Sequence, residues 1–229
     1  GSMQHISFQR YADRVECLQQ LAAGIAEQLQ QVLASEASAS LLLPGGSSPQ
    51  ALLPLLAAQR VDWARCKMSP TDERWLPAEA AQSNLRLLRD GLPNAHWLDP
   101  RLADQPEPAA SAWALALQDW LPFSAVLLGM GEDGHVASLF PGMPGLTAAL
   151  DLEQPIAALV GQAAAEPITR LSLNLSLLLS TRWLGLLVFG EAKRELIEAV
   201  LADTPASRNL PVHALLHQQR VPLTLYWAP

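Results

Sequence analysis

Two ionisable residues suited to acid–base chemistry stand close together in the segment Gly129–His135, which reads GMGEDGH. Its glycines let the chain turn tightly, so that the carboxylate of Asp133 and the imidazole of His135 are displayed together. A neighbouring carboxylate orients an imidazole and supports its protonated form, which equips the ring as a general base near neutral pH. We take both as candidate catalytic residues. The competing interpretation is a glycine turn with an exposed Asp and a solvated His.

The segment Pro44–Pro49, PGGSSP, has the features of an anion-binding loop. It follows the apolar run Leu41–Leu43 and leads into a predicted helix, where free backbone N–H groups point at an anion and glycines let it approach. The segment is not a Walker loop, since no Lys-Ser/Thr follows, and it lacks the G-x-G-x-x-G order. The alternative is an ordinary strand-to-helix turn with Ser48 as N-cap. The candidate phosphate ligands are Gly45, Gly46, Ser47 and Ser48.

Further charged residues lie at the edges of predicted strands. The segment Thr71–Arg74 comes just after the predicted strand Cys66–Ser69 and, taken alone, is interpreted as a charged loop whose ions pair with one another. Arg170 offers a bidentate fork for phosphate and Lys193 a compact charge, although either one, taken singly, is better explained as surface decoration. One cleft at the strand edges would collect them all. The candidates from these segments are Asp72, Arg74, Arg170 and Lys193.

Strands and helices alternate along the chain. Tyr11–Leu33 carries apolar residues, Val15 among them, every three or four positions, as an amphipathic helix does. The predicted strands are Leu41–Leu43, Cys66–Ser69, Ala95–Leu98, Ala125–Leu128, Ile156–Val160, Leu171–Leu173, Leu184–Phe189 and Leu223–Trp227. The predicted helices that follow are one opening at Pro49, then Ala80–Arg89, Glu107–Leu121, Asn174–Ser180, Glu191–Leu201 and Val212–His217. The stretches Ala103–Ala110 and Gly142–Gln154 are predicted surface connections.

This alternation predicts an α/β fold, an open, mostly parallel sheet with helices on both faces. Ligands of such sheets gather outside the carboxyl ends of the strands, which is where the candidate residues lie. No interdomain linker or internal repeat interrupts the pattern. Residues 4–229 are therefore predicted to form a single domain.

Composition narrows the classes of function. Of 229 residues, 50% are hydrophobic, which is enough to bury a sizeable core. Lys and Arg number 15 against 22 Asp and Glu, and the net charge of −7 argues against a nucleic-acid-binding protein. Apolar runs are far short of the ~20 residues of a membrane span. Residues 1–3 are interpreted as a cloning scar plus the start Met, and we expect a soluble, cytoplasmic protein.

Neither a disulfide framework nor a metal site is expected. The two cysteines, Cys17 and Cys66, lie far apart, with no C-x-x-C pair and no Cys/His cluster. His96, His213 and His217 have no ligand partners at metal-binding spacing and are interpreted as structural or solvated residues.

Taken together, the candidate segments resemble the 6-phosphogluconolactonase family. The longest similar stretch is Gly129–Gly142, GMGEDGHVASLFPG. The other similar segments are Pro44–Pro49, Asp72–Pro77, Ser83-Asn84, Pro167–Arg170, Gly190–Lys193 and Leu225–Trp227. The resemblance implies a Rossmann-like sheet shared with sugar-phosphate isomerases and glucosamine-6-phosphate deaminases. It also implies a cytosolic enzyme of the pentose phosphate pathway that hydrolyses 6-phospho-D-glucono-1,5-lactone to 6-phosphogluconate.

The same resemblance implies that no metal or organic cofactor is required. The expected partner is a small phosphorylated sugar lactone, with no nucleic acid and no membrane, and we expect a monomer or a weak homodimer. The chain departs from the family pattern at Pro44, where Ser is usual, and at Ser48, where Thr is common. Because proline lacks a hydroxyl and a backbone N–H, Pro44 cannot be a phosphate ligand.

A mechanism can be stated as a hypothesis. The phosphate rests on the loop Gly45–Ser48, with Arg170 and Lys193 supplying positive charge. The imidazole of His135 removes a proton from water that attacks the lactone carbonyl, since imidazole titrates near ~6.5. The partner Asp133 supports the ring. Arg74 approaches the sugar or the developing oxyanion.

Three alternatives accompany this hypothesis. An acyl-enzyme on Ser47 or Ser138 is the competing route, disfavoured because no G-x-S-x-G elbow is present. A sugar-phosphate isomerase or deaminase is the nearest other function, but deaminases of this pattern carry Asn-Glu-Pro where this chain has Leu139–Pro141. A non-catalytic sugar-phosphate sensor would need an output module, and no basic helix-turn-helix segment precedes Tyr11.

Overall fold

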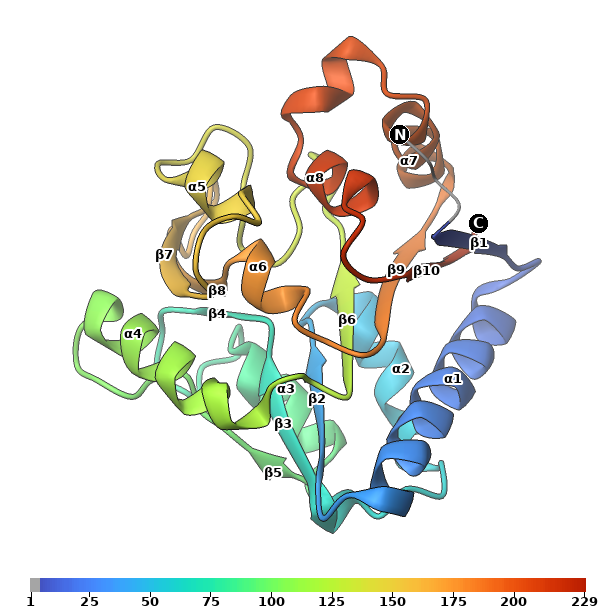
Figure 1. Ribbon diagram of the computed structural model, residues 1–229, viewed down its shortest axis with the longest axis vertical. Coiled ribbons are helices and arrows are strands. Elements are labelled where there is room, and N and C mark those ends of the chain that lie inside the picture. The colour runs from blue at the N-terminus through green and yellow to red at the C-terminus, as the bar shows by residue number, and fades with distance from the viewer. Residues whose placement is uncertain (1–4) are drawn as a thin grey trace.

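A seven-stranded sheet forms the centre of the computed structural model, which describes residues 5–229 (Figure 1). Its neighbouring strands all pair in parallel, so the predicted parallel sheet is confirmed. In spatial order the strands are β1 (Ile6–Arg10), β10 (Leu223–Ala228), β9 (Leu184–Phe189), β6 (Ala125–Gly129), β2 (Ala39–Leu43), β3 (Cys66–Pro70) and β5 (His96–Trp97). The proposed cloning scar, residues 1–3, lies outside the described residues.

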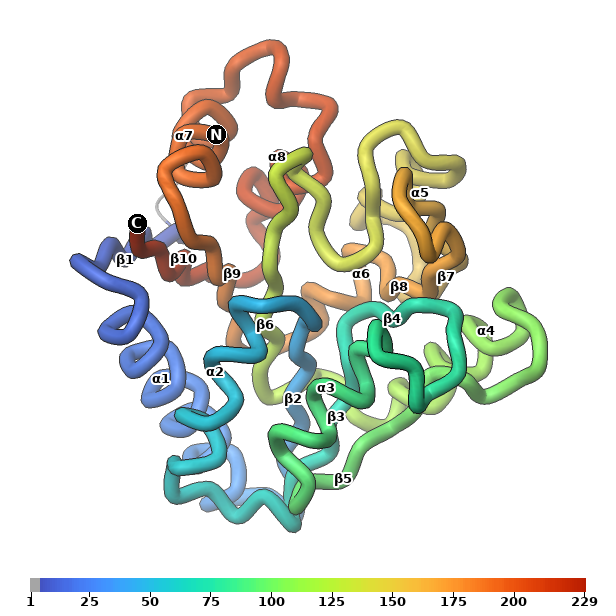
Figure 2. Tube along the Cα trace, turned by 180° about the vertical axis from the view of Figure 1, so that it is seen from behind, coloured from blue at the N-terminus to red at the C-terminus, as the bar shows by residue number. Residues whose placement is uncertain are grey.

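Helices cover both faces of this sheet, as predicted. One face carries α1 (Arg14–Ser35), α2 (Ser47–Ala57) and α3 (Asn84–Gly91). The other carries α4 (Pro106–Leu117), α5 (Leu146–Leu150), α6 (Leu175–Leu178), α7 (Glu191–Leu201) and α8 (Pro211–His217). Figures 1 and 2 show α1 and α4 on opposite sides of the central strands. The fold is a single, Rossmann-like α/β domain.

The side chains of β6 show how one strand serves two cores. Val126 and Leu128 are buried in the cluster beneath α4, while Ala125 and Leu127 are buried beneath α1. Successive residues of a strand point to opposite faces, so a run that is covered on both sides must be apolar throughout. The sequence pattern predicted this strand for that reason.

The amphipathic pattern also located α1. The Asp13 side chain accepts a hydrogen bond from the Glu16 backbone N–H at 2.8 Å and caps the helix start. Leu21 and Ile25 are fully buried, as expected. Val15, expected on the same face, lies in the first turn and is 62% exposed.

A second, antiparallel sheet of three strands was not predicted. In spatial order it contains β4 (Asp72–Arg74), β8 (Thr169–Leu173) and β7 (Ala158–Gln162). The expectation that 71–74 is a loop was wrong, because Asp72 pairs with Ser172 and Arg74 with Arg170 across β4 and β8. Three charged residues are too few to show an alternating pattern, and their partner lies far along the chain.

Several predicted boundaries also differ. The region 80–89 becomes helical at Asn84, because the Ser83 side chain caps α3 by accepting the Arg86 N–H at 3.1 Å. The expected connection 103–110 already contains the start of α4, where Pro106 suits the first helical turn. The expected connection 142–154 contains α5. Short 3₁₀ helices occur at Trp63–Arg65, Gln118–Trp120 and Pro205–Asn209.

Across residues 5–229, we find no helix whose length and apolar character would let it cross a membrane.

Candidate active site

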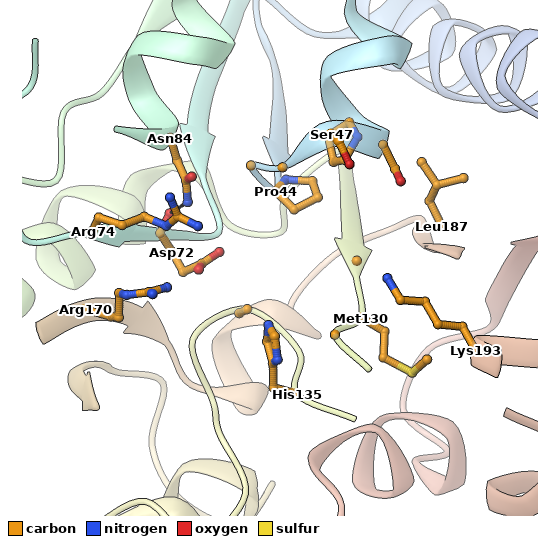
Figure 3. A pocket seen from close by; sticks show the side chains of 17 residues that line it. Pro44, Ser47, Asp72, Arg74, Asn84, Met130, His135, Arg170, Leu187 and Lys193 are labelled. Carbon is orange, nitrogen blue, oxygen red and sulfur yellow. Dashed lines mark hydrogen bonds between the residues drawn. The ribbon is translucent and has the colours of Figure 1, made fainter. Parts of the chain in front are cut away.

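A cavity opens where the carboxyl ends of β2 and β6 face the small sheet, and it collects most of the residues predicted from the sequence (Figure 3). The predicted residues that line it are Gly45, Gly46, Ser47, Ser48, Asp72, Arg74, His135, Arg170 and Lys193. Asp133 does not line the cavity but holds His135 from behind. The imidazole and the anion-binding loop therefore border one space, as the sequence hypothesis required.

The turn after β6 fixes the geometry of the Asp–His pair. The Asp133 Oδ1 atom lies 2.6 Å from Nδ1 of His135 and accepts the His135 backbone N–H at 3.0 Å. Partial burial by itself would raise the pKa of the Asp133 carboxyl, but these hydrogen bonds and the imidazole charge bring that pKa below its usual value. The carboxyl is thus an acceptor in this turn, and the His135 ring is held in one orientation.

The close approach of the ring requires glycine at position 131. A Cβ atom there would lie 2.1 Å from the Cε1 and Nδ1 atoms of His135, which no side chain tolerates. The Gly131 N–H donates to the His135 carbonyl at 3.0 Å and closes the turn. The turn is also braced from α8, because the Val212 N–H donates to the Gly134 carbonyl at 3.0 Å.

One aromatic ring contacts both the imidazole and a cation of the cavity. The Phe140 ring centroid lies 4.6 Å from that of His135, and the Arg170 guanidinium carbon lies 5.5 Å from the Phe140 centroid. Phe140 therefore contacts both groups and fixes their spacing. No residue-level pattern indicated this role; the signal was its place within the long stretch similar to the known family.

The loop before α2 presents uncapped backbone donors to the cavity. The N-cap of α2 is Gly46, with φ of 111°, and no side chain caps the helix. The expectation that Ser48 is the N-cap was wrong, because the helix already begins at Ser47. With no capping side chain, the N–H groups of the first turn remain directed at the cavity, where the helix dipole also favours an anion.

Gly45 lets α3 approach this loop. A Cβ atom at position 45 would lie 2.0 Å from Oδ1 of Asn84, so any larger residue would displace that side chain. The Asn84 amide in turn donates to the Asp72 carbonyl at 3.0 Å, and Asn84 lines the cavity. Asn84 was not among the candidates, although Ser83-Asn84 belongs to the segments that resemble the family.

The small sheet supplies two arginines to one side of the cavity. Arg74 and Arg170 are register partners on β4 and β8, and Arg170 is only 9% exposed. Burial lowers the pKa of Arg170 from its ordinary value, and the neighbouring charge of Arg74 lowers it further. The neighbouring carboxylates of Asp72 and Glu73 offset part of this effect. An anion bound beside the two guanidinium groups would further reduce their mutual repulsion.

The cavity cations form no direct ion pairs with the carboxylates of residues 5–229. Within residues 5–229, Arg74, Arg170 and Lys193 form no ion pair, whereas Arg101 and Arg194 each bind two carboxylates. The Arg74 and Arg170 side chains donate instead to backbone carbonyls. In Figure 3, Lys193 stands across the cavity from both arginines. Positive charge that is left unpaired around a cavity suits an anionic ligand.

The two carboxylates of β4 have separate roles. Asp72 accepts the Ser138 hydroxyl at 2.6 Å and the Thr71 hydroxyl at 2.7 Å, and it faces the cavity. Glu73 is fully buried and accepts the backbone N–H groups of Asn84 and Leu85 at the start of α3. It also pairs with Arg101 at 3.2 Å, so it fastens β4 to α3. The expectation that the charges of 71–74 pair with one another was wrong.

Comparisons with known proteins agree with this arrangement. The chain matches the family model for glucosamine-6-phosphate isomerases/6-phosphogluconolactonase over residues 12–227. It is 38% identical over 215 residues to a 6-phosphogluconolactonase of Pseudomonas putida, covering 91% of this chain and 87% of that protein. It is 36% identical over 231 residues to a 6-phosphogluconolactonase of Pseudomonas aeruginosa, covering 98% and 95%.

Among solved structures, a 6-phosphogluconolactonase from Shewanella baltica OS155 superimposes with a TM-score of 0.90 at 32% identity, over 100% of both chains. The fold and the matched family model define the class, the superfamily of glucosamine-6-phosphate isomerases and 6-phosphogluconolactonases. Within that class, the two Pseudomonas relatives and the Shewanella structure, each at least 32% identical to this chain, are all 6-phosphogluconolactonases. The chain belongs to the 6-phosphogluconolactonase family, and the resemblance read from the sequence is confirmed.

Proposed function

We propose that the protein hydrolyses 6-phospho-D-glucono-1,5-lactone to 6-phosphogluconate by direct attack of water. The observation that carries the proposal is one cavity that combines three cations without carboxylate partners and a His–Asp pair. A phosphorylated lactone needs both features: positive charge for its phosphate, and a base beside its carbonyl carbon. The relatives named for this activity support the same substrate.

The phosphate would bind at the start of α2. The N–H groups of Ser47 and Ser48 and the helix dipole would receive its oxygens, as at other helix N-termini. Arg170 and Lys193 would complete the positive surroundings. This local charge explains how a chain with a net charge of −7 binds a phosphate ester.

The base in this proposal is Nε2 of His135. A carboxylate only accepts, so the Asp133 contact assigns the proton of the neutral ring to Nδ1 and leaves the lone pair on Nε2. That nitrogen would take a proton from water while the water oxygen bonds to lactone C1. The bond from C1 to the ring oxygen would then break, and the imidazolium would return the proton to that oxygen.

Two further residues would act on the sugar. Arg74 would stabilise the oxyanion that develops on the lactone carbonyl or contact the sugar itself, as a cation in a partly dry site can. Asp72 would accept a sugar hydroxyl, since a carboxylate repels phosphate. Ser138 does not serve as a nucleophile in this scheme, because its buried hydroxyl already donates to Asp72.

The test is an assay on freshly generated 6-phosphogluconolactone, in a pH-stat or coupled to oxidation of the product, corrected for spontaneous ring opening. We expect rapid turnover that inactivated protein does not give. Tight binding of 6-phosphogluconate without turnover would favour the sensor alternative. Deuterium from solvent appearing at C2 of a sugar phosphate would favour the isomerase or deaminase alternative, for which Phe140 stands where the catalytic glutamate is expected.

The expected cytoplasmic location and the expected monomer or weak homodimer are part of this proposal. Membership of the 6-phosphogluconolactonase family supports the first, because the implied reaction belongs to the cytosolic pentose phosphate pathway. Fractionation of cells that express the tagged chain would check the location. Light scattering across a range of protein concentrations would check the oligomeric state.

A further inference from the structure

A second cluster of chemically capable side chains lies outside the cavity, between the end of α7 and α8. Asp203, His213 and His217 each offer one ligand atom, and these atoms all lie within 4.8 Å of one another. His213 and His217 stand one helical turn apart and share a face of α8. The sequence interpretation that these histidines lack ligand partners was wrong, because the 3₁₀ turn Pro205–Asn209 brings Asp203 back beside them.

Asp203 and His213 are held slightly closer together than two ligands on one ion. His213 Nε2 lies 2.8 Å from Asp203 Oδ1. Two atoms bound to one tetrahedral zinc ion, each at about 2.0–2.2 Å, lie about 3.3–3.6 Å apart, so a small outward shift of the exposed Asp203 carboxylate makes room for the ion. The rings of His213 and His217 stack with centroids 4.0 Å apart, so the second imidazole lies close to the same point.

One ring nitrogen of His217 is held by a backbone carbonyl, as is common for metal-bound histidines. Its Nε2 lies 2.7 Å from the carbonyl oxygen of Val200. Because a carbonyl only accepts, Nε2 carries the proton of the neutral ring and Nδ1 carries the lone pair. Backbone carbonyls commonly hold the second nitrogen of a ligating histidine in this way and fix its tautomer.

Solvent exposure of the cluster and the neighbouring Arg208 side chain both affect how an ion would bind. Asp203 is exposed and the two histidines are half-buried, so an ion can enter from solvent and water can complete its coordination. Arg208 competes for the carboxylate, with its Nε atom 3.0 Å from Asp203 Oδ1. An entering ion would displace this guanidinium and the proton that His213 shares with Asp203.

We propose that Asp203, His213 and His217 form a binding site for a divalent transition-metal ion such as Zn²⁺. Imidazole and carboxylate donors suit zinc, nickel and copper, whereas magnesium and calcium prefer all-oxygen sites. A bound ion links the end of α7 to α8. Since the Val212 N–H of α8 donates to Gly134, the ion also stabilises the support of the catalytic turn without entering the cavity.

The test is a calorimetric titration of the chelator-treated, full-length protein with ZnCl₂. We expect one equivalent to bind to the wild type and to His96→Ala, which removes an exposed histidine elsewhere. The double variant His213→Ala/His217→Ala should lose that equivalent, and Asp203→Asn should weaken it at least tenfold. Arg208→Gln should tighten binding several-fold because it removes the competing cation.

The active-site pair could itself attract zinc, so His135→Ala is the decisive control. The proposal requires that His135→Ala retains the equivalent; its loss there, or its survival in the double variant, would overturn the proposal. Circular dichroism before zinc is added verifies that each variant is folded, and His213→Gln replaces the double variant if that one is not. Co²⁺ absorption gives an independent readout, since visible bands should depend on His213. None of these outcomes depends on lactone turnover.

Discussion

The two sheets contribute to the cavity in different ways. The seven-stranded sheet presents loops at its strand ends, and these offer backbone N–H groups, tight glycine turns and the imidazole of His135. The three-stranded sheet presents side chains directly from its strands, Arg74 and Arg170 in register with each other. The large sheet is therefore suited to fix reacting groups through backbone geometry, whereas the small sheet supplies two of the three cations that the ligand would meet. Substitutions in the turn of the large sheet should therefore lower kcat, whereas substitutions in the small sheet should chiefly raise KM, and the two effects should also differ in size.

The largest effect is expected from His135→Ala, in the turn of the large sheet. Loss of general-base assistance should lower kcat by about 10²–10⁴-fold. Affinity for 6-phosphogluconate, measured by calorimetry, should change little because the protein groups proposed to bind the phosphate are not altered. His96→Ala is the matched control, since it removes an exposed imidazole far from the cavity. Full activity in His135→Ala would remove the base from the proposed mechanism.

A smaller effect of a different kind is expected from Arg170→Ala, in the small sheet. A hydrogen bond to a charged group contributes about 1.5–3 kcal/mol, so kcat/KM should fall about 10–150-fold, chiefly through KM. Arg170→Lys should recover part of the loss by restoring the charge without the fork. Arg182→Ala, which breaks an exposed pair with Glu36, serves as the control. An unchanged KM in Arg170→Ala would contradict the division of labour between the sheets.

Asn84, whose amide bonds to β4 of the small sheet, also packs against the loop before α2, and this packing can be tested at Gly45. The added methyl group of Gly45→Ala would meet Oδ1 of Asn84 at 2.0 Å, which should destabilise the fold by about 1–3 kcal/mol as overpacking does. Chemical denaturation measures this loss. The double variant Gly45→Ala/Asn84→Gly should regain much of the stability because the obstructing amide is gone. Strictly additive losses in the double variant would show that the clash is not the cause.

The smallest effect concerns the pH dependence of the Asp133–His135 pair. The folded protein lowers the pKa of Asp133 from 3.8, so the carboxylate favours folding above that pH, and this contribution is lost as pH falls through the lowered value. The side chain is 53% exposed, so the contribution should not exceed about 1 kcal/mol. The thermal midpoint of the wild type should exceed that of Asp133→Asn at pH 5, and the two should converge as pH falls below 3.8 through the lowered pKa. A gap that stays as large at pH 2 as at pH 5 would contradict this assignment.

Sequence patterns predicted most of the large sheet because its buried strands leave a local signal, but they missed the edge strand β1, which is only partly buried. The run Leu184–Phe189 is covered on both faces and is apolar throughout, and the glycine turn Gly129–His135 follows the similar run of β6. Repetition of strand and helix then indicated the parallel order. Both His135 and the loop Gly45–Ser48 follow predicted parallel strands. The sequence therefore indicated that they lie at the same edge of the sheet.

The same reasoning could not find the small sheet, nor could it find the cluster of Asp203, His213 and His217. β4 has three residues, all charged, and its partner β8 lies almost a hundred positions away. Asp203 and His213 are separated by a 3₁₀ turn that no periodicity predicts. Such contacts depend on tertiary packing. A single sequence therefore shows which residues are present but not which of them are in contact in the folded protein. Phe140 is the same case, since its contact with Arg170 joins two distant segments.

The position of β1 has a consequence for how the chain is made. This strand lies at the edge of the large sheet and, among the described residues, pairs with β10 alone. A ribosome makes β1 before the other strands of this sheet and β10 after them, so β1 stays unpaired while the strands between them are translated. Its hydrogen bonds form only after β10 has left the ribosome. Closure of this sheet edge therefore waits for the strand that is synthesised latest among the seven.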